Sequence, residues 1–274
     1  ALIGGVYVAR SGGDPEPHYA RAVEHHSRAI RLVPTKALFW HERALVHFNR
    51  ANHASDRGTD PMPHFRAALS DLDQANALNP QYPDALANRC DVRTQAGHAS
   101  PPGDGESLIR GALEDADRAI ALDTSRPQFY RFRGVAWLNL GQELARQGKD
   151  PTPSWTSAIA DLDEALSRKG DDADAWSCRG DIHYNLGSRA QEKKEPCREP
   201  YLAAAADYSK ALDLRPDDME RLFWRGLAYG NAAEYDRAVA DFEEVEKRSP
   251  SLDQFPAFRK WHSADWKGRT LALR

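Results

Sequence analysis

The chain has 274 residues, of which 41% are hydrophobic and 28% are charged, and its net charge is −4. This balance is that of an ordinary soluble domain, without the basic surplus that drives binding to nucleic acid or anionic lipid. No apolar run approaches the roughly 18 residues that a membrane-spanning helix needs, so we expect no membrane insertion.

Helix-stop signals divide the chain at regular intervals. Each follows a short run in which small and apolar residues alternate with polar ones, as in residues 75–80 and 211–216. The stops fall at residues 34, 80, 124, 170, 216 and 250, so their separations are 46, 44, 46, 46 and 34 residues. Near-regular spacing of this size is typical of an array of helix pairs.

Small and large residues occupy fixed positions within these intervals. The small residue of each first helix is Ala44, Cys90, Gly134, Gly180 or Gly226. The small residue of each second helix is Ala22, Ala68, Ala112, Ala158, Ala204 or Ala238, and three residues before it stands a large one: Tyr19, Phe65, Ile109, Trp155, Tyr201 or Tyr235. We expect the small residues where two helices approach closely, with the large ones filling the space between them.

The last interval carries the plainest motif. Gly226-x-x-Tyr229, Ala238-x-x-x-Phe242 and Pro250 match the tetratricopeptide pattern in residue type and in spacing. The chain therefore resembles a tetratricopeptide-repeat protein over essentially its whole length. The resemblance implies an all-α, right-handed α-solenoid (a superhelix) of antiparallel helix pairs, whose first helices line a concave groove.

The predicted organisation is a single array that spans residues 1–274. Gly5 aligns with Gly141 and Gly187, so residues 1–13 match the end of a first helix, and we expect a piece of a longer polypeptide. Large apolar residues recur at helical spacing after Pro250, which predicts a terminal capping helix. The predicted parts are a partial repeat 1–34, repeats 35–80, 81–124, 125–170, 171–216 and 217–250, and a capping helix 251–274.

The four long repeats exceed the family length by an insertion between their two helices. Residues 142–147 predict two more turns of a first helix, because they are good helix formers. The motif Asp150-Pro151-Thr152-Pro153 then predicts the start of the second helix, with the aspartate as cap and proline in the first turn. The same Asp-Pro motif recurs at Asp14 and Asp60.

Two charged columns run through the repeats. The arginines, each directly before the small residue of a first helix, are Arg43, Arg89, Arg133, Arg179 and Arg225. The aspartates, each three residues after the small residue of a second helix, are Asp71, Asp115, Asp161, Asp207 and Asp241. We predict a structural ladder of ion pairs between adjacent helices that fixes their register, in which Arg179 pairs with either Asp161 or Asp207.

A carboxamide column lies near the end of each first helix, at Asn49, Gln95, Asn139, Asn185 and Asn231. In the family this face lines the groove, and a carboxamide both donates and accepts hydrogen bonds, so the column predicts a ladder that holds a peptide by its backbone. Asp91, Arg131 and Asp181 share the face and are predicted to contribute. The alternative is that these carboxamides are helix-end residues that bond to nearby loops. The face leans acidic, which favours a partner of basic or mixed charge; its carboxylates are Asp84, Asp91, Asp174, Asp181 and Glu220.

Signatures of catalysis are absent from the sequence. It has no phosphate-binding loop and no nucleophile elbow, and its histidines lack metal-ligand spacing, so we expect no catalytic residue, no cofactor and no metal. Three scattered cysteines, Cys90, Cys178 and Cys197, give no disulfide framework and favour a reducing, cytoplasmic location.

The sequence thus predicts a non-catalytic scaffold for protein–protein interaction. It would bind a protein or peptide in the groove or along the edge formed by the inserted loops, and not nucleic acid. Two alternatives remain open. In the first, the chain is a regulatory or sensor arm of a larger enzyme, such as a kinase, protease or switch ATPase, and packs against the rest of a longer polypeptide. In the second, it is a structural subunit of a stable assembly.

Overall fold

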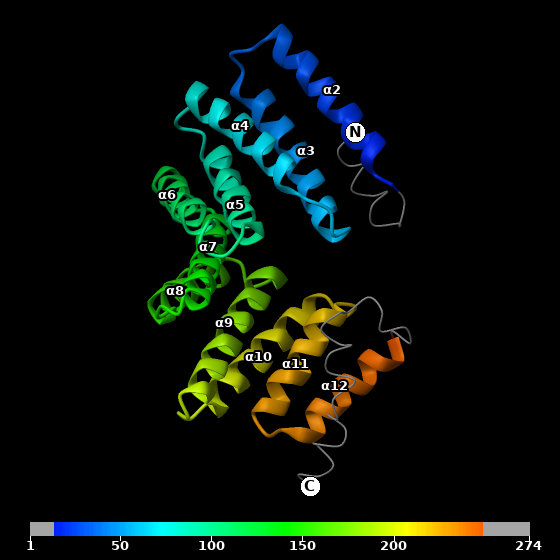
Figure 1. Cartoon of the computed structure of the whole chain (residues 1–274), viewed down its shortest axis with the longest axis vertical. Helices are drawn as coiled ribbons and strands as arrows, with labels where there is room; N and C mark the ends of the chain where they lie inside the picture. Colours follow the sequence, from blue (N-terminus) through cyan, green and yellow to red (C-terminus); the bar gives the residue numbers. More distant parts are fainter. Residues whose placement is uncertain (1–13, 249–274) are drawn as a thin grey trace. The chain divides into compact units, whose positions relative to one another are not determined.

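The computed structural model describes residues 14–248, which form eleven α-helices and no strand (Figure 1). The first helices are α3 (Ala37–Asp56), α5 (Pro83–Ala99), α7 (Pro127–Arg146), α9 (Ala173–Glu192) and α11 (Met219–Asn231). The second helices are α2 (Glu16–Leu32), α4 (Met62–Leu78), α6 (Glu106–Leu122), α8 (Thr152–Arg168), α10 (Arg198–Leu214) and α12 (Tyr235–Arg248). The predicted all-α class with paired helices is confirmed, whereas residues 1–13 and the predicted capping helix lie outside the described residues.

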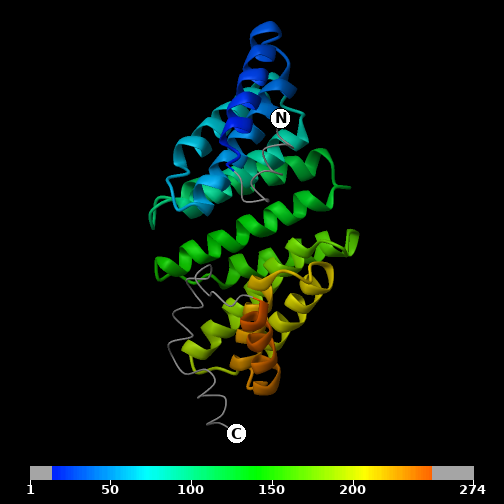
Figure 2. The ribbon, with the colours of Figure 1, turned by 90° about the vertical axis from the view of Figure 1, so that its right-hand side faces the viewer.

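The chain divides between Glu164 and Ala165, inside α8, into two compact units. Consecutive helices run antiparallel and pack against one another, from α2 to α7 in the first unit and from α9 to α12 in the second (Figure 2). In the first unit, α5 also contacts α3 and α7, so the three first helices lie in sequence order. Both units are built from the same helix pair, and the single array across them stays a prediction.

Glycine allows the two helices of a pair to approach closely, along a contact that we call the seam. A Cβ atom on Gly180 would lie 2.7 Å from the ring of Tyr208, and one on Gly226 would lie 2.7 Å from the ring of Phe242. Both distances are shorter than carbon atoms tolerate, and Tyr208 is fully buried, so its ring has little room to move. The small-residue columns therefore mark the seam, as the sequence predicts.

A second row of glycines allows close helix approach where the extended ends of the first helices meet the second helices. A Cβ atom on Gly97 would lie 2.7 Å from Ile109, and one on Gly187 would lie 2.9 Å from Tyr201. Ile109 and Tyr201 belong to the large-residue column and are 0% and 1% exposed. The predicted extension of the first helix is confirmed, because α7 continues to Arg146 and packs through this row.

The Asp-Pro motifs start three of the second helices. The aspartate carboxylate accepts a hydrogen bond from the backbone N–H two residues later, at 3.1 Å for Asp14, 2.9 Å for Asp60 and 3.3 Å for Asp150. That N–H has no partner inside the helix, so the carboxylate supplies its acceptor. The negative charge of the carboxylate also interacts favourably with the positive end of the helix dipole.

Four of the first helices end in the same left-handed turn. The residue in the left-handed conformation is Gly58 (φ 67°), Gly148 (φ 73°), Lys194 (φ 60°) or Ala233 (φ 62°). In each case the residue after the left-handed one donates its backbone N–H to the carbonyl five residues earlier than itself, at 2.8–2.9 Å. Only glycine adopts this conformation without steric cost, so the turns at Lys194 and Ala233 are strained.

Candidate interaction surfaces

Each first-helix arginine binds an aspartate of the second helix in its own pair. Nε and Nη2 donate to the two carboxylate oxygens, at 2.8–2.9 Å and 2.5–2.6 Å respectively. The aspartates are at most 6% exposed, so these bonds lie in the seam. This geometry is the bidentate fork in which arginine and carboxylate bind most strongly. The pairs are Arg43–Asp71, Arg89–Asp115, Arg133–Asp161, Arg179–Asp207 and Arg225–Asp241.

The remaining guanidinium nitrogen, Nη1, reaches the second helix of the preceding pair in four of these arginines. A bond of this kind ties the seam to the neighbouring pair, so each of the four guanidinium groups touches three helices. The acceptors are Asp73 for Arg89 and Asp117 for Arg133, at 2.7 and 2.6 Å, and the hydroxyls of Ser27 for Arg43 and Ser209 for Arg225, at 3.0 and 3.2 Å.

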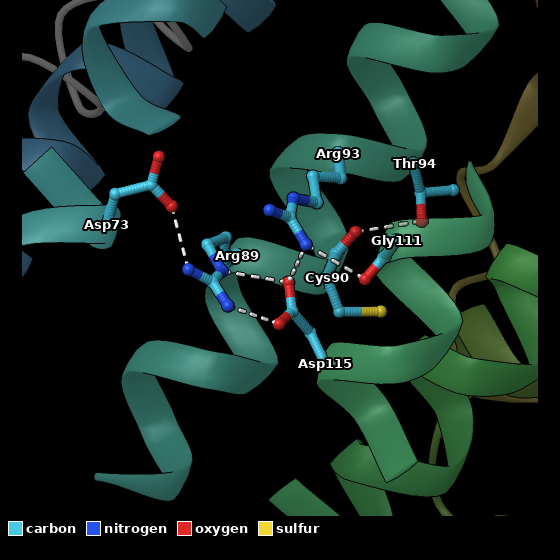
Figure 3. A network of polar contacts seen from close by, with 7 residues as sticks. All are labelled: Asp73, Arg89, Cys90, Arg93, Thr94, Gly111 and Asp115. Carbon is cyan, nitrogen blue, oxygen red and sulfur yellow. Dashed lines mark hydrogen bonds and ion pairs between the residues drawn. The ribbon is translucent and has the colours of Figure 1, made fainter. Parts of the chain in front are cut away.

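Two arginines share the carboxylate of Asp115 (Figure 3). Besides Arg89, Arg93 donates from Nη1 to Asp115 at 2.8 Å and to the backbone oxygen of Gly111 at 3.0 Å. Asp115 is 1% exposed, so its charge depends on these partners. The adjacent Cys90 is fully buried, and burial raises the pKa of its thiol well above the usual value, which keeps the thiol protonated and unreactive.

Histidines take the place of Arg93 in two other pairs. His47 Nε2 lies 3.9 Å from Asp71, and His183 Nε2 lies 3.8 Å from Asp207. Burial lowers the pKa of His47, although the Asp71 carboxylate acts to raise it. The ring of His47 is therefore neutral at pH 7, in contrast to the permanent cation at Arg93.

The predicted carboxamides of the first unit make local hydrogen bonds. Nδ2 of Asn49 and of Asn139 each donates to the backbone carbonyl four residues earlier, at 2.7 and 2.9 Å. Gln95 donates to Asp91 in its own helix at 3.0 Å. These bonds go to the same helix and not to the loops that the alternative interpretation names, and they use only the nitrogen. The Oδ1 acceptors of Asn49 and Asn139 remain available to an incoming N–H group.

In the second unit, the same columns connect neighbouring helix pairs. Asn231 Nδ2 donates to the Tyr184 hydroxyl at 3.1 Å, and Arg221 donates to Asp181 at 2.9 Å. Asn185 is half-buried in this column. Burial raises the pKa of Asp181, while Arg221 acts to lower it. The structure thus brings Asp181 and Asn231 into bonds with residues outside the predicted set.

Arginines lie on the carboxylates that were expected to make this face acidic. Arg126 Nη1 lies 3.4 Å from Asp84, and Arg215 donates to both oxygens of Asp174 at 2.6 and 3.1 Å. These arginines flank helices and belong to none of the aligned columns, which is why the sequence pattern does not reveal them. The expected acidic lean is therefore offset locally.

Half-buried side chains of α3, α5 and α7 form what we call the first-helix face of the first unit. Residues four apart along a helix lie on one side of it, and α5 contacts both of the other helices. The face comprises Leu45, Asn49, Asp84, Asp91, Gln95, Arg131, Val135 and Asn139. It includes the carboxamides and charged residues that the sequence predicts for this part of the chain, and their role in binding stays a prediction.

Two buried polar clusters have no counterpart in the sequence analysis. Glu143 is 0% exposed and accepts hydrogen bonds from Gly103 N at 2.6 Å and from Gln147 at 2.9 Å, and these bonds lower its carboxyl pKa. It ties the extension of α7 to the loop before α6. His41 is 5% exposed. Its Nδ1 lies 3.0 Å from the Tyr82 hydroxyl, and its Nε2 lies 2.7 Å from Nδ2 of Asn88. Neither cluster repeats along the chain, so no column indicates it.

Residues 14–248 contain no cluster of three or more histidine, cysteine, aspartate or glutamate side chains placed to hold a metal ion. No helix in that range combines the length and the apolar character that crossing a membrane requires.

Solved structures share this arrangement at low sequence identity. PilW, a widely conserved type IV pilus biogenesis factor, is 15% identical with a TM-score of 0.59, over 94% of this chain and 96% of PilW. PilF of Pseudomonas aeruginosa is 14% identical with a TM-score of 0.57, over 94% and 95% of the two chains. TTC0263, a thermophilic TPR protein of Thermus thermophilus, is 21% identical with a TM-score of 0.54, over 78% and 97%.

No family model matches the sequence, and no curated protein matches it either. The structural likeness establishes the fold, which is that of tetratricopeptide-repeat proteins.

Proposed function

We propose that the chain is a non-catalytic scaffold that holds an extended peptide of a protein partner along the first-helix face. The observation that carries this proposal is the hydrogen bonding of the Asn49 and Asn139 side chains. Each amide is held by a hydrogen bond from Nδ2 to its own helix, at 2.7 and 2.9 Å, and this bond fixes the position of Oδ1. A fixed acceptor loses little conformational entropy when a peptide N–H binds to it.

The surroundings of these acceptors support the same function. Leu45 and Val135, whose carbonyls accept those bonds, carry half-buried apolar side chains on the same helices. A surface of apolar patches with a few placed polar groups suits a peptide, because burial supplies affinity and the polar groups supply orientation.

The test is selection of binding peptides from a random-peptide display library on the purified chain. Affinities of the selected peptides are then measured for the chain and for the double variant N49A/N139A. The expected result is a loss of about tenfold or more in affinity, from two lost hydrogen bonds, with an unchanged urea unfolding midpoint.

The matched control is Gln74→Ala, which removes an exposed carboxamide from the second helix α4. It is expected to leave affinity unchanged. A failure to select any peptide, or equal affinities for the chain and the N49A/N139A variant, would contradict the proposal.

A further inference from the structure

The first-helix face of the first unit carries its charges in opposite pairs. Arg126 Nη1 lies 3.4 Å from Asp84, and the two side chains are 41% and 37% exposed. Burial raises the pKa of the Asp91 carboxyl, while the bond from Gln95 and the charge of Arg131 both act to lower it. Each carboxylate of this face therefore already has a resident cation acting on it.

The cation over Asp84 is held from a second side. Arg126 Nε donates to Asp123 at 3.2 Å, in the turn before α7. Asp123 is itself fixed by Ser125, whose N–H and hydroxyl donate to it at 3.0 and 2.6 Å. Arg126 is therefore tethered where it lies, and an incoming cation would have to compete with it for Asp84.

Charged side chains of a peptide would gain little on such a surface. An incoming lysine or arginine would compete with a resident arginine, and an incoming carboxylate would approach a resident aspartate. In both cases the charge loses water without a free opposite charge to replace it. An uncharged peptide avoids this cost, and the apolar side chains of Leu45 and Val135 give it a surface to cover.

We propose that the segment held by this face is an extended peptide with no charged side chain at its contact positions. This inference rests on the function proposed above and specifies the chemical class of the partner. It replaces the basic or mixed-charge partner expected from the sequence. The same pairing recurs in the second unit, where Arg215 binds Asp174 at 2.6 and 3.1 Å.

The test uses the same random-peptide library on the full chain and on three variants. R126Q uncovers Asp84, D84N/D123N frees Arg126 from both of its carboxylates, and D84N/R126Q removes the charges of the Asp84 pair. All three changes are at half-exposed sites, so the fold is expected to persist, which circular dichroism and the urea midpoint check. Peptides selected on the unmodified chain should show no enrichment of charged residues. Their affinity should change by less than about twofold between roughly 0.05 and 0.5 M salt.

The variants should move selection in opposite directions. R126Q should enrich lysine and arginine, D84N/D123N should enrich aspartate and glutamate, and D84N/R126Q should return to uncharged peptides. For R126Q and D84N/D123N, affinity should fall by up to about fivefold at high salt, since a surface ion pair of up to about 1 kcal/mol is screened.

Peptides from the unmodified chain that share fixed charged residues would overturn the inference. The proposed function would survive that result if N49A/N139A still lost affinity for those same peptides. If no peptide is selected, or if N49A/N139A binds as well as the chain does, the proposed function and this inference fall together.

Discussion

The seam and the first-helix face differ in how far they vary from one repeat to the next. The seam repeats one arginine, one aspartate and one small residue in every pair, and its aspartates are at most 6% exposed. Within the first-helix face of the first unit, the column directly after the small residue changes from Leu45 to Asp91 and Val135. The difference indicates that the geometry of helix pairing fixes the seam, whereas the face is free to take residues that suit a partner. The following changes test that division.

The largest effect is expected where a seam carboxylate is removed. Asp115→Asn leaves Arg89 and Arg93 without their shared partner in the seam, so the free energy of unfolding should fall by about 3 kcal/mol or more. Urea denaturation measures the loss. The control is Asp117→Asn in the same helix, because the Asp117 side chain is 62% exposed and its pair with Arg133 is expected to contribute about 0–1 kcal/mol. Equal losses for both variants would remove the distinction between seam and surface.

Overfilling the seam should cost less than breaking its charge pair. In Gly180→Ala, the new methyl group lies 2.7 Å from the buried ring of Tyr208 and should destabilise the chain by about 1–3 kcal/mol. Gly170→Ala is the matched control, since its Cβ would lie 3.7 Å from the nearest atom. The shift of the urea midpoint decides, and a tolerated Gly180→Ala would show that the helices do not need glycine there.

Acid should weaken the first unit through its histidines. Burial lowers the pKa of His41, His47 and His64 below the ordinary 6.5, so the unfolded chain binds more protons as the pH falls through that value. Stability should therefore be fully present at pH 7.5 and partly lost at pH 5.5. We expect a lower urea midpoint at pH 5.5 than at pH 7.5. This difference between the two midpoints should be smaller in His47→Gln and unchanged in His98→Gln, whose histidine is exposed. Identical midpoints at the two pH values would refute this.

The smallest effect concerns the ends of the first helices. Lys194→Gly relieves a left-handed backbone that costs a side-chain-bearing residue about 1 kcal/mol, so it should stabilise the chain by about 0.5–1 kcal/mol. Gly148→Ala makes the reverse change where no atom lies within 4 Å of the new Cβ, and it should destabilise by a similar amount. Thermal melting of the two variants should shift in opposite directions. Shifts of the same sign would exclude backbone strain as the cause.

Repetition explains which features the sequence predicts. The helix pairs, the extension of α7 and the small-residue columns each recur at fixed spacing, and a recurring pattern can be aligned within one chain. The choice between Asp161 and Asp207 for Arg179 could not be made that way, because both aspartates lie in the same column. Arg126, which lies over Asp84, was missed because it occurs once and flanks a helix. Single contacts depend on how turns fold back, which spacing does not encode.

The bond between Arg179 and Asp207 joins the two helices of one pair and represents the ion pairs that hold the helices in register. A double-mutant cycle with Arg179→Ala, Asp207→Ala and the double variant, followed by urea denaturation, isolates that bond. The predicted coupling is about 1 kcal/mol or more, because the fork is bidentate and Asp207 is 4% exposed. Additive losses, with no coupling between the two residues, would contradict the claim that these pairs fix the register of the helices.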